Sequence, residues 1–272
     1  NVDSIIVHLK NAITEENPMC RFGISPFGIW RNKDKDPEGS ETRGGQTNYD
    51  DLYADILLWL REGWIDYVAP QLYWEFGHSA APYEVLIDWW AKHSYGKHCY
   101  IGLGIYRAGS NTAWKDKTQL PRMINALRSH PEIQGAIYFS SKTFEKNPNG
   151  WNDSLQNNYY KYPAIIPAMD WIDTTRPQQP IVVKVSSETM GGVFVLDIKK
   201  HVQSKPVKGF IIYSFAGDDT VRDTEDPRNI LQIAYTTAST SVMLSTASNK
   251  NRVLAVSTLD TNNNESELVM VE

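Results

Sequence analysis

Cysteine is nearly absent from this sequence: Cys20 and Cys99 are the only two in 272 residues. Two cysteines cannot build a disulfide framework or a multi-cysteine zinc site, and they leave the redox compartment open. The six histidines are scattered without the spacing that metal ligands show. We therefore predict no metal site and no cofactor.

Long apolar runs and blocks of basic residues are also missing. No stretch approaches the roughly 18 apolar residues of a membrane span. The formal net charge is -5, and Lys and Arg are dispersed. This balance argues against nucleic acid or an anionic membrane surface as the main partner. Asn1 opens without a basic and apolar signal pattern, so we expect any export signal to lie upstream.

Aromatic residues, in contrast, are plentiful. The chain holds nine Trp and fourteen Tyr, and its hydrophobic content of 41% supports a proper core. Flat amphipathic rings suit the apolar faces of sugars as well as they suit cores. Most of these rings are expected in the core. For rings that contact a ligand instead, the charge balance of the chain favours a neutral or weakly charged ligand.

The first part of the chain alternates apolar strands with amphipathic helices. The predicted strands are 21–24, 67–72, 100–105 and 135–139, and the predicted helices are 2–17, 49–62, 83–93 and 118–129. This alternation indicates a parallel sheet with crossover helices. Since a complete (β/α)8 TIM-type barrel needs about 250 residues, we predict half a barrel in residues 1–165.

The pattern changes near residue 165. Prolines become dense, which predicts a linker over residues 166–178. Alternation with period two follows, and the predicted strands there are 181–185, 193–197, 209–213, 241–244, 252–256 and 268–271. We therefore predict a small antiparallel β-sandwich in residues 179–272.

One acid follows a strand end in the barrel-like part. Glu75 comes three residues after Leu72, where barrel enzymes mount catalytic groups. Glycoside hydrolysis commonly uses two carboxyl groups, one of them a general acid. Glu75 is therefore the candidate catalytic acid, and a solvated loop glutamate is the alternative interpretation.

Polar and aromatic side chains surround Glu75 in the sequence. Gln71, Tyr73 and Trp74 can hold a sugar through amide and phenol groups and a stacked indole. Because side chains alternate along a strand, not all three can face the same way, and packing under a helix is the alternative for each. The equivalent positions after the other strands are Ser25, Trp30, Tyr106, Arg107 and Tyr138. Arg107 suits a carboxylate or a charged sugar substituent.

Asp66 stands at the opposite, N-terminal end of its strand. In barrels this end serves stability, so we expect a turn or capping role for this residue.

The segments 22–30 and 66–74, with 48–55 and 62–66, closely resemble the YngK-like bacterial glycosyl-hydrolase-like family, the tenth of that series. The resemblance covers residues 1–165. It implies the C-terminal half of the barrel, about strands 5 to 8, with an acidic strand-four motif before the first helix. The segments 254–257 and 264–266 resemble a fibronectin type III module.

The family resemblance implies a glycoside hydrolase of the cell envelope, periplasmic or extracellular, that acts on cell-wall or surface polysaccharide. Peptide-free peptidoglycan strands are the leading candidate, and part of the catalytic site is expected outside residues 1–272. The alternative is a non-catalytic glycan-binding or adhesion protein. Sugar identity, linkage and stereochemical outcome are left open. Unpaired edges of a half barrel also predict self-association.

Overall fold

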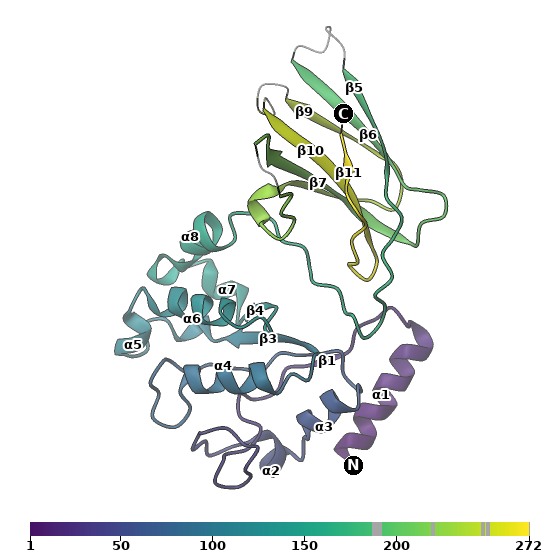
Figure 1. Cartoon of the computed structure of the whole chain (residues 1–272). Helices are drawn as coiled ribbons and strands as arrows, with labels where there is room; N and C mark the ends of the chain where they lie inside the picture. The colour runs from purple at the N-terminus through teal and green to yellow at the C-terminus, as the bar shows by residue number, and fades with distance from the viewer. Residues whose placement is uncertain (187–191, 219–220, 246–247, 249–250, 272) are drawn as a thin grey trace. The chain divides into compact units, whose positions relative to one another are not determined.

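The computed structural model describes residues 1–186, 192–218, 221–245, 248 and 251–271. The chain forms two compact units, residues 1–158 and 159–272 (Figure 1). They are called unit 1 and unit 2 below, and each is described by itself.

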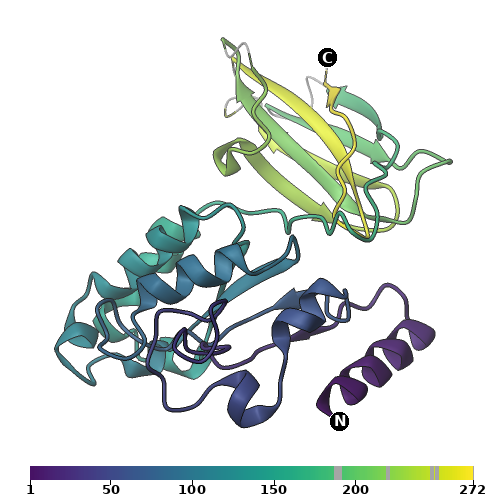
Figure 2. The ribbon, with the colours of Figure 1, turned by 60° about the horizontal axis from the view of Figure 1, so that its bottom comes forward.

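Unit 1 contains a four-stranded parallel sheet (Figure 2). Its order follows the sequence: β1 (Gly23–Ile24), β2 (Tyr67–Val68), β3 (His98–Leu103) and β4 (Gly135–Tyr138). The predicted parallel sheet is confirmed. β1 and β4 are its edges, and both the half barrel and the self-association stay predictions.

β2 is shorter than the predicted strand 67–72. Pro70 has no N–H to donate to a sheet ladder, so regular pairing stops after Val68. Extended backbone resumes at Gln71, which bridges to Phe27 on one side and Gly102 on the other. The strand direction therefore continues to the polar cluster after the proline.

Three of the predicted helices form nearly as expected: α1 (Val2–Glu16), α4 (Tyr83–Lys92) and α6 (Gln119–Arg128). α4 contacts β3, and α6 contacts β4. The shorter helical segments of unit 1 are η1 (Ile105–Arg107), α5 (Thr112–Lys115), α7 (Ser141–Phe144), η2 (Pro148–Gly150), α8 (Trp151–Ser154) and η3 (Leu155–Tyr159).

The predicted helix 49–62 is wrong as a single element. The structure has α2 (Asn48–Leu52) and α3 (Ile56–Arg61). Tyr53 adopts a left-handed conformation with φ 53°, which a right-handed helix cannot continue through. Asp55 then starts α3, because its carboxylate accepts a hydrogen bond from the Leu58 N–H at 3.1 Å.

Asp66 fastens the N-terminal end of β2. Its side chain is 6% exposed and accepts hydrogen bonds from the Phe22 N–H at 2.9 Å and from Lys10 Nζ of α1 at 3.3 Å. The carboxylate thus joins α1, the segment before β1, and β2. This agrees with a stability role at this end of the sheet.

Replacing Asp66 by alanine should lower the unfolding free energy of unit 1 by about 1–3 kcal/mol, because a part-buried N–H and an ammonium lose their acceptor. Urea unfolding followed by tryptophan fluorescence measures this. The control is Asp50→Ala, whose carboxylate pairs with Arg31 at 2.8 Å but is 36% exposed and should matter little. Equal stability of the Asp66 variant and the parent would contradict the assignment.

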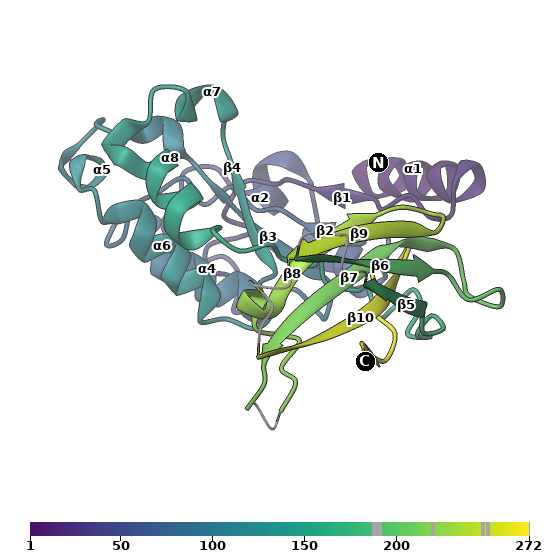
Figure 3. The ribbon, with the colours of Figure 1, turned by 90° about the horizontal axis from the view of Figure 1, so that it is seen from above.

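Unit 2 is an antiparallel β structure with two sheets (Figure 3). One sheet has the order β11-β10-β7-β8 and the other β5-β6-β9. The bounds are β5 (Ile181–Ser186), β6 (Val193–Lys199), β7 (Val207–Ala216), β8 (Ile230–Tyr235), β9 (Thr240–Ser245), β10 (Arg252–Asp260) and β11 (Val269–Met270), with η5 (Pro227–Asn229) before β8. Buried side chains from both sheets, such as Phe194, Phe210 and Val256, form one core.

The antiparallel character predicted for this part is confirmed, and the fibronectin type III assignment stays a prediction. β8 was missed by the sequence reasoning. Its exposure pattern departs from simple alternation, since Leu231 and Gln232 are both exposed, and the pairing with β7 shifts register after Ile212. A bulge of this kind hides the period-two signal.

Candidate functional site

The segments that follow the four parallel strands begin at the same edge of the sheet, because parallel strands share their carboxyl-terminal ends. Ser25 and Gln71 meet there. The Ser25 hydroxyl donates to the Ala69 carbonyl at 2.9 Å, and the Gln71 amide donates to the Ser25 carbonyl at 3.1 Å. Two residues predicted from separate strands are thus brought together.

The side chains of Tyr73 and Trp74 lie against the segments after different neighbouring strands. Tyr73 lies over Gly104, after β3, and Trp74 lies over Gly28, after β1. A Cβ added to Gly104 would lie 2.9 Å from Tyr73 Cγ, and one added to Gly28 would lie 2.7 Å from Trp74 Cζ3. Any larger residue at either position would displace the ring. The two glycines therefore make room for the aromatic side chains at this edge.

Three rings form a cluster, called the aromatic triad below: Tyr73, Tyr106 and Phe139. Tyr73 stacks on Phe139 with centroids 6.1 Å apart, and Tyr106 meets both rings edge-on at 5.9 Å. Tyr106 is 53% exposed and Phe139 is 56% exposed. Such exposure is high for rings packed in a cluster, so the triad offers an apolar surface to a ligand.

Phe139 was not among the predicted site residues, whereas its neighbour Tyr138 was. Tyr138 is half-buried and packs edge-on against Phe144 of α7 at 5.4 Å. Side chains at adjacent positions of an extended segment point to opposite faces, so only one of the two can join the triad. In the sequence, Phe139 differs from the predicted residue Tyr138 only by lying one position later. That position assigns Phe139 to a face of the sheet only once the register of β4 is known.

Glu75 is half-buried, and both of its carboxylate oxygens accept hydrogen bonds. Oε1 accepts from Asn111 Nδ2 at 2.9 Å, and Oε2 accepts from Trp114 Nε1 at 2.9 Å. Asn111 also caps α5, because its Oδ1 accepts from the Trp114 N–H. Glu75 is thus tied to the segment that precedes and begins α5.

This environment determines the charge state of Glu75. Partial burial raises its pKa, but hydrogen bonds from its own backbone N–H, Trp114 and Asn111, together with the nearby His78, outweigh the burial and hold the pKa below its ordinary value. The side chain is therefore ionised at neutral pH. An ionised carboxylate can act as a base, a nucleophile or a stabiliser of positive charge, whereas a general acid must be protonated.

Arg107 lies next to the indole of Trp114, the same side chain that donates a hydrogen bond to Glu75. Its guanidinium is 5.7 Å from the centre of the Trp114 ring, and its buried Nε has no hydrogen-bond partner within the described residues. Arg107 and Glu75 therefore both contact Trp114, one through the ring and the other through the indole N–H.

Trp30 is not available for ligand contact in this structure. It is only 4% exposed, stacks on Trp89 at 6.2 Å and meets the edge of Tyr49 at 5.5 Å. Core packing takes the place of the predicted sugar contact, because Trp30 packs against Tyr49 of α2 and Trp89 of α4.

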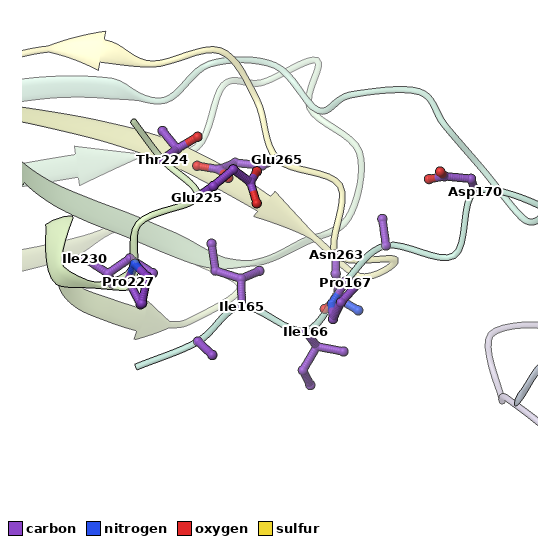
Figure 4. A pocket seen from close by; sticks show the side chains of 12 residues that line it. Ile165, Ile166, Pro167, Asp170, Thr224, Glu225, Pro227, Ile230, Asn263 and Glu265 are labelled. Carbon is purple, nitrogen blue, oxygen red and sulfur yellow. The ribbon is translucent and has the colours of Figure 1, made fainter. Parts of the chain in front are cut away.

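A separate cavity of about 490 Å³ lies in unit 2 (Figure 4). Ile165, Pro227 and Ile230 contribute apolar surface, and Glu225 and Glu265 contribute carboxyl groups. Oε1 of Glu265 accepts from the Tyr213 hydroxyl at 2.7 Å and from Ser257 Oγ at 2.5 Å. Among the residues that the structure describes, no aromatic side chain lines this cavity, so their lining lacks the stacking surface found in unit 1.

Glu265 should make the stability of unit 2 depend on pH. Burial raises its pKa more than the hydrogen bonds from Ser257 and Tyr213 lower it, and the nearby Glu225 adds to the rise. An unfolded glutamate loses its proton near pH 4.3, before the folded one, so stability falls as pH rises from there through the folded pKa. Glu265→Gln should flatten this fall.

Hydrogen exchange of β7 and β10 amides, measured from pH 4.5 to 8 on the parent and the variant, checks this expectation after correction for intrinsic exchange. Glu225→Gln is the matched control, because it removes only the neighbouring charge and should flatten the fall in part. Parallel curves for the parent and the Glu265 variant would refute the expectation.

The described part of the chain contains no helix that combines the length and apolarity needed to cross a bilayer. Within the same residues, no three His, Cys, Asp or Glu side chains gather in a way that could hold a metal ion. Cys20 is exposed and Cys99 buried, and neither is in a disulfide.

Comparison with known proteins identifies relatives of this chain. Residues 1–121 match the family model described as glycosyl hydrolase-like 10. The chain is 41% identical over 218 residues to glycosyl hydrolase YngK of Bacillus subtilis, which covers 79% of this chain and 42% of that protein. It is 37% identical over 155 residues to glycosyl hydrolase DigH of Escherichia coli K12, covering 54% of this chain and 35% of that protein.

The DigH protein of Shigella flexneri gives the same identity and coverage. The chain thus spans about two fifths of the length of the YngK protein and about one third of the DigH proteins. The 218-residue alignment is longer than unit 1, so it includes part of unit 2.

Proposed function

The N-terminal unit of the chain belongs to the glycosyl hydrolase-like 10 family, and from this premise we propose that the protein is a glycoside hydrolase acting on O-glycosyl bonds of a bacterial cell-wall or surface polysaccharide. Peptide-free peptidoglycan strands are the leading candidate substrate. Such a substrate would place the protein in the cell envelope, in the periplasm or outside the cell.

The aromatic triad is the observation that carries the proposal. Tyr73, Tyr106 and Phe139 come from the segments after three different strands and leave two half-exposed rings at the edge where barrel enzymes bind substrate. A sugar ring presents C–H groups on its flat face, and these pack on aromatic rings. Ser25, Gln71 and Arg107 would supply the polar contacts that fix its orientation.

Glu75 is the carboxyl group that we propose for the chemistry. Three acids in the loop after β1 are engaged elsewhere, since Asp36 pairs with Arg31, Glu38 with Arg61 and Glu41 with Lys33. The low pKa of Glu75 supports a role in its ionised form, next to the oxocarbenium-like charge that develops during hydrolysis.

Two-carboxylate chemistry then needs a second group that carries the proton. We propose that it comes from barrel strands other than β1 to β4. The general-acid role expected from the sequence would fall to that group.

A non-catalytic glycan-binding protein is the second candidate. The observation in its favour is that protein donors already occupy both oxygens of Glu75. In this case the triad would hold the glycan and Glu75 would only position α5.

Incubation of a form of the protein that contains the complete barrel with peptide-free peptidoglycan strands tests these proposals. Retention of the strands together with release of reducing ends would support the hydrolase. Retention without release would favour the binding protein, and absence of both would refute the sugar site.

A further inference from the structure

The cavity of about 490 Å³ in unit 2 has no part in the proposed sugar site, and we call it the unit 2 cavity. Its lining comes from three segments: 164–170 before β5, 224–230 at the start of β8, and 263–265 between β10 and β11. Figure 4 shows the side chains of Glu225 and Glu265 close together above Ile165. The volume lies within the range of small-molecule sites.

Glu265 offers one free carboxylate oxygen at this cavity. Its Oε1 already accepts two hydrogen bonds, from the Tyr213 hydroxyl and from Ser257 Oγ, whereas Oε2 accepts none from the described residues. The exposed carboxylate of Glu225 likewise has no hydrogen bond or ion pair within that part of the chain. Glu225 contributes to the raised pKa of Glu265, so the two groups lie close enough to repel each other when both are ionised.

The described residues supply no cation to this pair of carboxyl groups. A second cavity of about 350 Å³ shares both groups and is also lined by Arg176 and Arg222. Arg176 pairs with Glu267, and Arg222 donates to a backbone carbonyl at 3.2 Å. The charge of Arg176 lowers the pKa of Glu265 less than Glu225 raises it. Among the described residues that line the unit 2 cavity, none is Lys, Arg or His and three are acids, so its charge is complementary to a cationic ligand.

The lining also limits the kind of cation. A divalent metal ion needs several oxygen ligands, yet in the described part of the chain no three His, Cys, Asp or Glu side chains gather for one. A guanidinium binds a carboxylate best through two parallel hydrogen bonds, and Glu265 has only one free oxygen. An ammonium has three N–H donors and can donate to both Glu265 and Glu225. The apolar side chains of Ile165, Pro227 and Ile230 suit an alkyl chain attached to that ammonium.

The walls of the cavity are fixed before a ligand enters. Ile230 is 7% exposed and belongs to a core cluster against which Ile165 also packs. The loop that carries Glu225 is held by Asp223, whose Oδ1 accepts from the Glu225 N–H at 2.9 Å and whose carbonyl accepts from Asn229 Nδ2 at 2.9 Å. Binding therefore needs little reorganisation of the protein.

We propose that the unit 2 cavity binds an alkyl chain that ends in a primary ammonium group, with the ammonium on Glu265 and Glu225 and the chain along Ile165 and Ile230. Such a group is carried by the lysine side chain of a peptide and by a free alkylamine. The inference does not depend on the proposed sugar site, because it uses no residue of unit 1.

NMR titration of the 272-residue chain at pH 8 and 0.15 M NaCl tests this inference with n-pentylamine, methylamine and 1-pentanol. Both amines are protonated at this pH. Pentylammonium should shift the amide signals of residues 224–230 and 263–265. It should bind about tenfold or more tightly than either of the others, because methylammonium lacks the alkyl chain and pentanol lacks the charge.

The two sources of the ammonium group are distinguished by a fourth ligand, Nα-acetyl-lysine N-methylamide. Tighter binding of this compound than of pentylammonium would identify a peptide as the source. Weaker binding would identify a free amine, and either order supports the proposed site.

The variants Glu265→Gln and Glu225→Gln should each weaken pentylammonium binding about tenfold or more and leave 1-pentanol binding unchanged. Asp197→Asn in β6 is the control, because it removes the same charge from unit 2 but does not touch the lining. Circular dichroism checks that each variant is folded. Glu225 is exposed, so its variant keeps the test valid if Glu265→Gln does not fold.

Equal binding of pentylammonium and 1-pentanol would overturn the inference, because the carboxyl groups would then select nothing. Equal binding of pentylammonium and methylammonium would also overturn it, since the apolar walls would then play no part. A loss in the Asp197 variant as large as in the two glutamate variants would reduce the effect to general charge attraction. Absence of binding by every ligand would refute the site.

Discussion

A chain in which Tyr106 and Phe139 are both replaced by alanine is expected to lose about 100-fold or more of its affinity for bacterial glycan strands. The two rings supply the exposed part of the aromatic triad, at 53% and 56% exposure. Their removal leaves only Tyr73, whose ring lies over Gly104. In the parent, burial and the nearby Tyr106 raise the pKa of the Tyr73 hydroxyl. Retention assays and calorimetry with the same strands measure the loss.

The control for this double variant is Tyr235→Ala in β8, which removes a ring that is 60% exposed in unit 2. It should leave binding unchanged. The exchanges Tyr106→Phe and Phe139→Tyr should preserve most of the affinity, because they keep the ring area. Undiminished binding by the double alanine variant would show that sugar stacking occurs elsewhere.

Replacing Glu75 by glutamine is expected to lower turnover by about 10²–10⁴-fold, the usual contribution of a group that transfers a proton or stabilises charge. The test uses whichever form of the protein releases reducing ends. Because Glu75 acts ionised in this proposal, the acid limb of the pH profile should follow its lowered pKa, below the ordinary glutamate range. A plateau that extends to that acidity is the accompanying signature.

The same substitution also disturbs structure, since a glutamine amide would meet the Trp114 indole N–H or the Asn111 amide donor to donor. Trp114→Phe separates the two effects. It removes one donor, keeps the carboxylate, and should allow the pKa of Glu75 to rise, moving the acid limb of the pH profile upward.

Turnover that survives Glu75→Gln would remove Glu75 from the mechanism. A positioning role would then remain for it, with lower stability of α5 in the variant. That result would leave the hydrolase proposal standing and assign its chemistry to other carboxyl groups.

The sequence predicted much of the framework. Alternating strands and helices indicated the parallel sheet of unit 1, and period-two runs indicated the antiparallel sheets of unit 2. It also placed Ser25 and Gln71 at strand ends, where the structure joins them by a 3.1 Å hydrogen bond. These features depend on local periodicity, which neighbouring residues encode. They also depend on the rule that parallel strands end at the same edge of a sheet.

Other features required the tertiary structure. Trp30 and Phe139 both follow strands, yet one is 4% exposed and the other 56% exposed. Glu75 is an isolated acid in the sequence, yet its partners Asn111 and Trp114 lie 36 and 39 residues away.

Composition and periodicity thus determined by themselves the class of each unit and the edge at which to look for a site. The tertiary structure decided which rings are exposed and which protonation state of Glu75 is stable. The reason is that exposure and pKa depend on distances across strands and loops, and local sequence patterns do not contain those distances.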